Sequence, residues 1–227
     1  MRFLNDKAFT EKHGPGVIAI FTATLGRYRE FDIAKESTVG VFGTEFKWAM
    51  GLNASFMMNK IIREMKPEMR WIWFQGDDHL WHPDLLIKLL ARDVDMVAPL
   101  MLQKAPPFSH VVFGGDFSGT ERSLLNQKKG LVDISGKTIG NGGLLVRRRV
   151  LDEMKDPWYE TGQTDSEYYG GDIYFVHKAQ KETGAKLYID MDNTQGHIFH
   201  GAVWPQMDEK GVLGASIGTA LDFVNGI

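Results

Sequence analysis

The chain reads Trp71-Ile72-Trp73-Phe74-Gln75-Gly76-Asp77-Asp78-His79-Leu80-Trp81-His82-Pro83-Asp84, an apolar run that passes through two adjacent carboxylates to a proline. The apolar run predicts a buried strand, and Pro83 suits the first turn of a helix whose leucines, within residues 85–90, form its apolar face. Asp77 and Asp78 are therefore expected at the carboxyl end of a strand, where open α/β sheets bind their ligands. Two carboxylates there suit Mg²⁺ or Mn²⁺ bridging a diphosphate. The alternative is a solvated acidic loop whose negative charges interact favourably with the dipole of the following helix.

Length and composition predict a folded protein. The 227 residues can bury a full core, most simply as one large domain, and 43% hydrophobic with 24% charged residues is ordinary for a globular chain. Because there is no cysteine, disulfides, thiolate catalysis and zinc-thiolate sites are excluded. Residues 1–12 lack the apolar core of a signal peptide, and no apolar run approaches the roughly 20 residues that cross a bilayer. We therefore expect no membrane insertion and a cytoplasmic location, which is the host cytoplasm for a viral protein.

The charge of the chain is close to balanced. A net charge of −3, from 26 basic and 29 acidic residues, provides no global field that would attract nucleic acid. The dense basic runs are Lys128-Lys129 and Arg147-Arg148-Arg149. A solvated turn between a strand and a helix is the expected role of the second run, and contact with phosphate is the alternative.

Alternating strands and helices predict a largely parallel sheet in the first half of the chain. Residues 17–21 predict a buried strand, and residues 45–65 carry apolar side chains at helical spacing and predict a helix. Another strand is expected at residues 95–100, after the acidic segment and its helix. Shorter pieces at residues 111–113 and 131–134 predict a small antiparallel portion.

Two segments of small residues are candidates for contact with a nucleotide. A turn containing Thr22 and Thr24 follows the first predicted strand. Residues 138–143 end in Gly142 and Gly143, which permit close approach of the backbone to a ligand or a turn with positive φ. This second segment is weak as a nucleotide motif, because it precedes a strand instead of linking a strand to a helix.

A further acidic residue, Asp172, opens a predicted helix that runs to about residue 182 and stops before Gly184. Asp172 has two interpretations. It is an N-cap, which is a common use of aspartate, or it is a general base that takes a proton from an acceptor hydroxyl.

The last part of the chain contains a candidate metal ligand and a tail. His197 follows a strand predicted at residues 186–190 and a short polar loop, and it is either a metal ligand or a structural histidine. The tail, residues 201–227, contains a weak helical pattern at residues 215–224. It is expected either to cover the active site when a donor binds or to be a static packed terminus.

In this order, the segments resemble the GT-A glycosyltransferases, in particular their compact family 2-like members. The resemblance covers about residues 17–198. The matching segments are residues 74–78 with Pro83-Asp84 for the acidic metal-binding motif, 142–148 with 157–159 for the acceptor side, 171–175 for the Gly-Glu-Asp segment, and 189–190 with 196–198 for the closing histidine motif.

The resemblance implies a fold and a division of the chain. The fold is α/β, a single GT-A, Rossmann-like domain with a mostly parallel central sheet flanked by helices and a small antiparallel portion. This domain would span residues 1–200, with a nucleotide-sugar half at about 17–100 and an acceptor half at about 101–200. The tail at 201–227 would be the cover.

The resemblance also implies a metal-dependent transferase. It would move a sugar from a nucleoside diphosphate sugar, with a UDP-sugar expected, to a hydroxyl of a glycan or of a hydroxymethylated pyrimidine in DNA. Asp172 would be the catalytic base, and Asp78 with His197 would hold Mn²⁺ or Mg²⁺. The donor would contact Thr22, Thr24, Asn53, Asp77, Gly142 and Gly143. The acceptor would contact Trp158, Tyr159 and Arg147.

Three positions depart from the family pattern. Gly76 stands where the first aspartate of an Asp-x-Asp motif is expected, Gly171 replaces the usual acid before Asp172, and Leu52-Asn53 replaces an arginine-asparagine pair. Two other functions therefore stay open. One is a nucleotidyltransferase acting on a sugar phosphate, and the other is a non-catalytic module that binds a nucleotide sugar.

Overall fold

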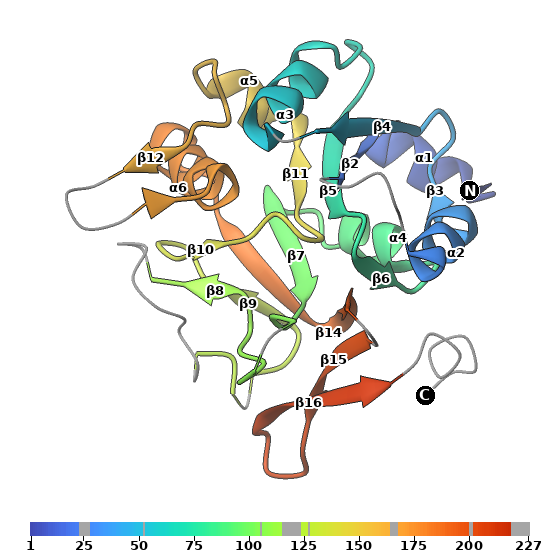
Figure 1. Ribbon diagram of the computed structural model, residues 1–227. Helices are drawn as coiled ribbons and strands as arrows, with labels where there is room; N and C mark the ends of the chain where they lie inside the picture. The colour runs from blue at the N-terminus through green and yellow to red at the C-terminus, as the bar shows by residue number, and fades with distance from the viewer. Residues whose placement is uncertain are drawn as a thin grey trace.

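The computed structural model describes residues 1–22, 28–51, 53–104, 106–114, 124–126, 128–163, 168–199 and 202–218 (Figure 1). The helices of this part of the chain are α1 (Lys7–His13), α2 (Arg29–Ser37), α3 (Ala54–Arg63), α4 (Leu85–Ala91), α5 (Arg148–Glu153) and α6 (Gly171–Thr183). The strands of the main sheet are β2 (Val17–Thr22), β4 (Glu45–Met50), β5 (Trp71–Gly76), β6 (His79–Trp81), β7 (Met96–Leu100), β9 (Leu131–Asp133), β11 (Leu145–Arg147), β14 (Leu187–Ile198), β15 (Ala202–Met207) and β16 (Leu213–Gly218). The short pairs outside it are β1 (Arg2–Phe3) with β3 (Val39–Gly40), β8 (Val112–Phe113) with β10 (Thr138–Ile139), and β12 (Gly162–Gln163) with β13 (Tyr168–Tyr169).

The main sheet has the order β16-β15-β14-β7-β11-β5-β2-β4, and β6 and β9 also pair with β14. Strand β2 is parallel to β4 and β5, and β14 is parallel to β7. Strand β11 lies between β5 and β7 and is antiparallel to both. The predicted α/β, Rossmann-like fold is confirmed, with a sheet that is mixed.

Helices cover both faces of the sheet (Figure 1). Alternate residues of β5 point to opposite faces, so that Ile72 and Phe74 join one core and Trp71 and Trp73 join the other. Helices α3, α5 and α6 pack on the first core, and α2 and α4 pack on the second. Leucines of α4 are buried as expected, because they form one continuous apolar face. None of the described helices is long and apolar enough to cross a membrane.

The helix expected over residues 45–65 is wrong for its first part. Residues 45–50 form β4, which pairs in parallel with β2 along its whole length. Phe46 and Trp48 both pack on the second core, as the two-residue period of a strand requires. Helix α3 begins only after Asn53, whose side chain caps it by accepting a hydrogen bond from the amide of Phe56 at 2.9 Å. Pairing across the sheet therefore prevails over the helical spacing of the apolar residues.

The end of the chain also differs from the expectation. The polar loop expected before His197 is part of β14, which has an irregular register between Asp190 and Thr194. Asp190 is buried there. Arg92 offsets the cost of burying its carboxylate by donating two hydrogen bonds to it, at 2.8 and 2.7 Å. The helix expected at residues 215–224 is wrong for its described part, since β16 pairs with β15. The remaining residues, 219–227, lie outside the described part.

Candidate active site

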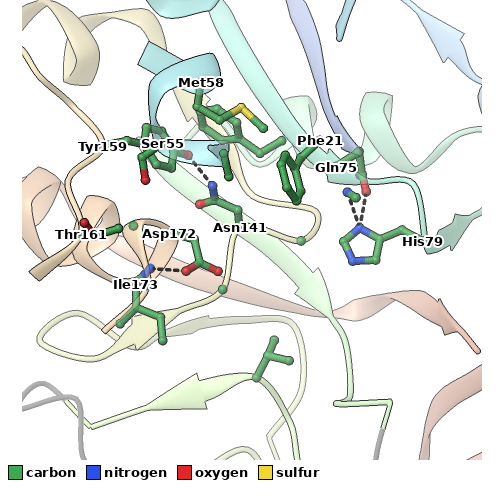
Figure 2. Close-up of a pocket in the computed structure, with 18 of the residues that line it drawn as sticks. Phe21, Ser55, Met58, Gln75, His79, Asn141, Tyr159, Thr161, Asp172 and Ile173 are labelled. Atoms are coloured by element: carbon green, nitrogen blue, oxygen red, sulfur yellow. Dashed lines mark hydrogen bonds between the residues drawn. The ribbon is translucent and has the colours of Figure 1, made fainter. Parts of the chain in front are cut away.

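A cavity of about 1660 Å³ lies at the carboxyl ends of the central parallel strands (Figure 2). Phe21 of β2, Gly76 of β5 and Met101, which follows β7, form one side of it. Asn53, the N-cap of α3, and the first residues of α3 and α6, including Asp172, form the other side. The cavity is thus at the edge of the sheet where open α/β folds bind ligands, as the acidic segment predicted.

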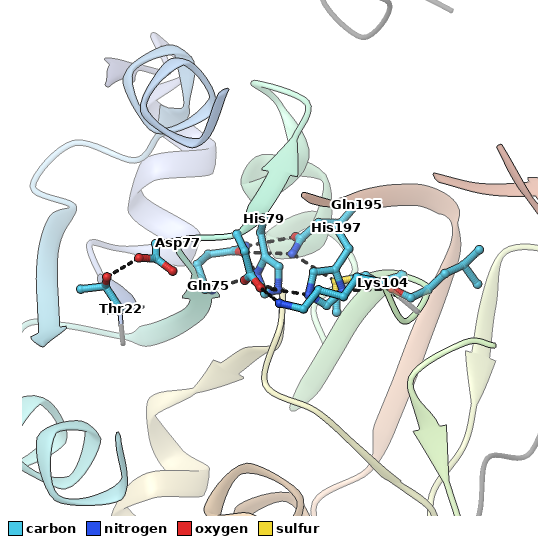
Figure 3. A network of polar contacts seen from close by, with 11 residues as sticks. Thr22, Gln75, Asp77, His79, Lys104, Gln195 and His197 are labelled. Carbon is cyan, nitrogen blue, oxygen red and sulfur yellow. Dashed lines mark hydrogen bonds and ion pairs between the residues drawn. The ribbon is translucent and has the colours of Figure 1, made fainter. Parts of the chain in front are cut away.

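Three side chains that line the cavity and can hold a metal ion come together, and Figure 3 shows two of them, His79 and His197. Asp78, His79 and His197 each offer a ligand atom, and these atoms lie within 4.8 Å of one another. Nε2 of His79 lies 3.6 Å from Oδ1 of Asp78, and Nε2 of His197 lies 3.3 Å from Oδ2 of the same carboxylate. One carboxylate and two imidazoles are a donor set that fits a divalent transition metal.

Strand pairing brings the two histidines together. Strand β6 is antiparallel to the second half of β14, and in this register His79 is the partner of His197. The two imidazole rings are 5.0 Å apart and nearly perpendicular, with an angle of 73° between them. The amide of Ile198 also donates to the carbonyl oxygen of Asp78 at 2.6 Å, which fixes the backbone between the ligands.

The hydrogen bonds around this cluster leave one imidazole nitrogen of His197 facing Asp78. Nδ1 of His197 lies 3.1 Å from the carbonyl oxygen of Leu102, which can only accept, so Nε2, 3.3 Å from Oδ2 of Asp78, is the nitrogen available to a cation. Burial lowers the pKa of His79 to about 3, and its imidazole is therefore neutral at pH 7. Burial by itself raises the pKa of Asp78, yet hydrogen bonds with His197 and Lys104 hold that pKa well below its usual range.

Two glycines, Gly76 and Gly142, leave room for the side chains of Asp78 and His79. A Cβ atom at Gly76 would lie 2.6 Å from Oδ1 of Asp78 and 3.1 Å from Cε1 of His79. A Cβ atom at Gly142 would lie 2.6 Å from Cε1 of His79 and 2.5 Å from Cε of Met101. The departure at Gly76 from the Asp-x-Asp pattern thus has a steric reason, because the aspartate and the histidine fold back over this position.

Asp172 lies in the other half of the cavity, at the second position of α6 (Figure 2). It is not the N-cap, which is Gly170, and its Oδ1 accepts a hydrogen bond from the amide of Ile173 at 2.9 Å. The N-terminal ends of α3 and α6 are in close contact, since a Cβ atom at Gly171 would lie 2.2 Å from Oγ of Ser55. The departure at Gly171 therefore also follows from packing.

Tyr159 and Asn141 complete this half of the cavity. The side chain of Asn141 donates to the hydroxyl of Tyr159, whose ring stacks on Phe175 with centroids 4.6 Å apart. Burial raises the pKa of Tyr159 well above its usual value, so the phenol stays protonated. Oδ1 of Asn141 is buried without a hydrogen-bond partner among the described residues, and it can accept a hydrogen bond from a ligand.

The predicted donor residues are placed in different ways. Asn53 and Gly142 line the cavity, and Gly143, next to Gly142, has a φ of 78° that only glycine adopts readily. The hydroxyl of Thr22 donates to the carboxylate of Asp77, and neither residue is among those that line the cavity. Thr24 lies outside the described residues.

Of the predicted acceptor residues, Tyr159 lines the cavity and Trp158 does not. The indole of Trp158 donates to the carbonyl oxygen of Leu151 at 2.8 Å and packs on the first core. Arg147 pairs in register with Trp71, at the opposite end of β5 from Gly76. The structure therefore does not bring Trp158 or Arg147 to the cavity.

Acidic residues neutralise the basic run that begins at Arg147. Arg147 bonds to Asp93 at 3.1 Å, Arg148 to Asp152 at 2.6 Å and Arg149 to Asp95 at 2.8 Å. The interpretation of this run as a turn between a strand and a helix fits β11 and α5, which meet there.

Sequence reasoning missed two residues of the site. His79 follows the acidic pair directly, but its role depends on the pairing of β6 with β14. Lys104 belongs to a stretch without clear periodicity, and its ammonium lies 2.7 Å from Oδ2 of Asp78. The one available signal was the presence of an imidazole beside two carboxylates.

No protein-family model and no curated protein matches the sequence. The fold, however, is similar to that of solved structures. A197 from STIV aligns over 96% of this chain and 97% of its own, with a TM-score of 0.58 and 16% identity. GalNAc-T7 with UDP, GalNAc and Mn²⁺ aligns over 82% of this chain with a TM-score of 0.50 and 10% identity. S. aureus TarS 1–349 in complex with UDP-GlcNAc aligns over 85%, with a TM-score of 0.48 and 12% identity.

The chain spans 43% of the GalNAc-T7 chain and 56% of the TarS chain, but nearly all of A197. Together with the mixed sheet and the position of the cavity, the likeness to A197 and GalNAc-T7 defines the fold class. The fold is GT-A-like, as the order of the sequence motifs predicted.

Proposed function

We propose that this chain is a metal-dependent glycosyltransferase that uses a nucleoside diphosphate sugar and a hydroxyl acceptor. The observation that carries the proposal is that Asp78, His79 and His197 meet in the same cavity as Asp172, at the carboxyl edge of a GT-A-like sheet. The carboxylate and the imidazoles would hold a divalent cation. When bound, that cation offsets the negative charge that grows on the departing diphosphate.

Asp172 is proposed as the general base. As the acceptor oxygen forms a bond to the anomeric carbon, the bond from that carbon to the diphosphate breaks, and the hydroxyl proton passes to the Asp172 carboxylate. The products are the glycosylated acceptor and the nucleoside diphosphate. Attack from the face opposite the leaving group inverts the anomeric centre. If Asp172 instead only binds the acceptor, the reaction can retain the anomeric configuration.

The donor set favours Mn²⁺ over Mg²⁺. Mg²⁺ demands oxygen ligands and releases its water reluctantly, whereas two of the three side chains here are imidazoles. GalNAc-T7 in its complex with UDP and Mn²⁺ is a precedent for this pair of ligands in a similar fold. A UDP-sugar with Mn²⁺ is therefore the proposed combination.

A hydroxyl of a sugar or glycan is the preferred acceptor. The rival, a hydroxymethylated base in DNA, would use the run that begins at Arg147 for contact with phosphate, which is the alternative interpretation of that run. That run lies at the opposite end of the sheet and is paired with acids. Closure of the C-terminal tail over the acceptor remains a proposal from the sequence.

A screen of nucleoside diphosphate sugars tests the proposed function. The chain is incubated with each donor and with Mn²⁺ or chelator, and release of the free sugar and nucleoside diphosphate is measured. We expect slow, metal-dependent hydrolysis of one donor, accelerated by a saccharide acceptor. Release of pyrophosphate from a nucleoside triphosphate would instead identify a nucleotidyltransferase. Binding of a donor without turnover in the presence of acceptors would indicate a binding module.

A further inference from the structure

Two buried side-chain amides, those of Gln75 and Gln195, lie beside His79 and His197 of the candidate metal site (Figure 3). Gln75 of β5 and Gln195 of β14 are 2% and 0% exposed. Each donates to the other, from Nε2 of Gln75 to Oε1 of Gln195 at 3.1 Å and from Nε2 of Gln195 to Oε1 of Gln75 at 3.0 Å. Burying polar groups costs stability unless they are hydrogen-bonded, and this reciprocal pair satisfies both amides. Gly143 leaves the space, because a Cβ atom there would lie 2.8 Å from Oε1 of Gln195.

The amide pair reaches His79 through one atom. Nδ1 of His79 lies 3.1 Å from Oε1 of Gln75 and 2.8 Å from the backbone nitrogen of Gly76. One neighbour accepts and the other donates. Nδ1 can therefore be satisfied in both neutral tautomers, accepting from Gly76 when it is bare and donating to Gln75 when it carries the proton.

Only one of these tautomers can bind a metal through Nε2. An imidazole coordinates with a lone pair, so a proton on Nδ1 leaves Nε2 free, and a proton on Nε2 blocks it. His197 has an acceptor for Nδ1 in the carbonyl oxygen of Leu102, 3.1 Å away. For His79 the acceptor is Gln75, and the hydrogen bond from Gln195 keeps the oxygen of Gln75 turned toward the ring.

We propose that Gln75, oriented by Gln195, is the positioning residue that makes His79 a metal ligand by holding the proton on Nδ1. This inference rests on the proposed function, because it concerns the cation of the same site. When a cation binds, the His79 proton resides on Nδ1 and is shared with Gln75, and the amide of Gly76 gives up its acceptor. In this role Gln75 acts through the imidazole of His79.

The test compares Gln75→Leu with Gln75→Glu. Both substitutions break the reciprocal amide pair, but only glutamate retains an acceptor for Nδ1. Binding of Mn²⁺ alone is measured by calorimetry. We expect Gln75→Leu to weaken binding by about ten- to a hundredfold, the scale known for outer partners of metal ligands, and Gln75→Glu to bind within about threefold of the wild type or more tightly. Equal losses in both variants would show a merely structural role and overturn the inference.

A spectroscopic readout reports the tautomer directly. With Zn²⁺ as a diamagnetic probe, the ¹⁵N shifts of the His79 imidazole are expected to show the proton on Nδ1 in the wild type and in Gln75→Glu. If Gln75→Leu does not fold, Gln195→Leu supplies the test, since it leaves Gln75 without its orienting donor and should also weaken binding. A wild-type chain that binds neither cation overturns the metal centre of the proposed function. A wild-type chain that binds while Gln75→Leu or Gln195→Leu binds equally well overturns only this inference.

Discussion

The ammonium nitrogen of Lys104 lies 2.7 Å from Oδ2 of Asp78, the same oxygen that faces Nε2 of His197 at 3.3 Å. A divalent cation held by Asp78 and His197 would have to share this oxygen with the lysine. The side chain of Lys104 is half exposed, so it can leave the carboxylate at little cost. An anionic diphosphate beside the cation offers the ammonium a new partner.

Replacing Lys104 should therefore act in opposite directions on the two ligands. We expect Lys104→Met to bind Mn²⁺ alone up to about fivefold more tightly, corresponding to about 1 kcal/mol for a partly exposed pair. The same variant should bind UDP more weakly in the presence of Mn²⁺. Calorimetry with each ligand measures both effects, and Lys128→Met, at an exposed lysine outside the cavity lining, is the matched control. Weaker Mn²⁺ binding in Lys104→Met would contradict this prediction.

Removing the carboxylate of the cluster should abolish metal-dependent turnover. We expect Asp78→Ala to reduce donor hydrolysis roughly a hundredfold or more, as in the loss of a group that stabilises the charge of a transition state. Excess chelator should reduce the wild type to a similar level, and added Mn²⁺ should restore the wild type but not the variant. Asp84→Ala, in an exposed acid beyond β6, is the control. Full activity in chelator would contradict a metal mechanism.

Asp172→Asn should separate chemistry from binding. The amide is nearly isosteric with the carboxylate but cannot accept the acceptor proton, so we expect transfer to fall by about a hundredfold to ten thousandfold. UDP affinity in the presence of Mn²⁺ should stay within about twofold of the wild type, because Asp172 lies at the start of α6, in the half of the cavity away from the cluster. An equal loss of UDP affinity would assign Asp172 to donor binding.

The elements that were predicted well have local signals. Strand β5 is a continuous apolar run, and the leucines of α4 form one face. The sequence of β4 has no such local signal. Phe46 and Met50 fit the period of a helix, but the segment is a strand because it pairs with β2. Propensity is a weak prior that tertiary context overrides.

The candidate site divides in the same way. Asp78 could be predicted from its place after a strand, and His197 from its place near the end of the motif order. The participation of His79 could not be predicted from the sequence, because it depends on how the three-residue strand β6 pairs with β14. The exclusion of Arg147 has the same origin, since the antiparallel direction of β11 carries that residue to the far end of the sheet.

Gly76 gives the sharpest test of the ligand geometry. A Cβ atom there would lie 2.6 Å from Oδ1 of Asp78, closer than real Cβ atoms approach, so the carboxylate has to move. We expect Gly76→Ala to weaken Mn²⁺ binding by about tenfold, the scale seen when the orientation of metal ligands is disturbed. Gly214→Ala in β16, where the nearest atom would be 3.8 Å away, is the matched control and should bind like the wild type. Gly76→Asp, which restores the Asp-x-Asp pattern, carries the same Cβ atom and should also bind Mn²⁺ less tightly. If Gly76→Asp binds Mn²⁺ more tightly than the wild type, the family pattern and not the arrangement of Asp78, His79 and His197 describes the metal site.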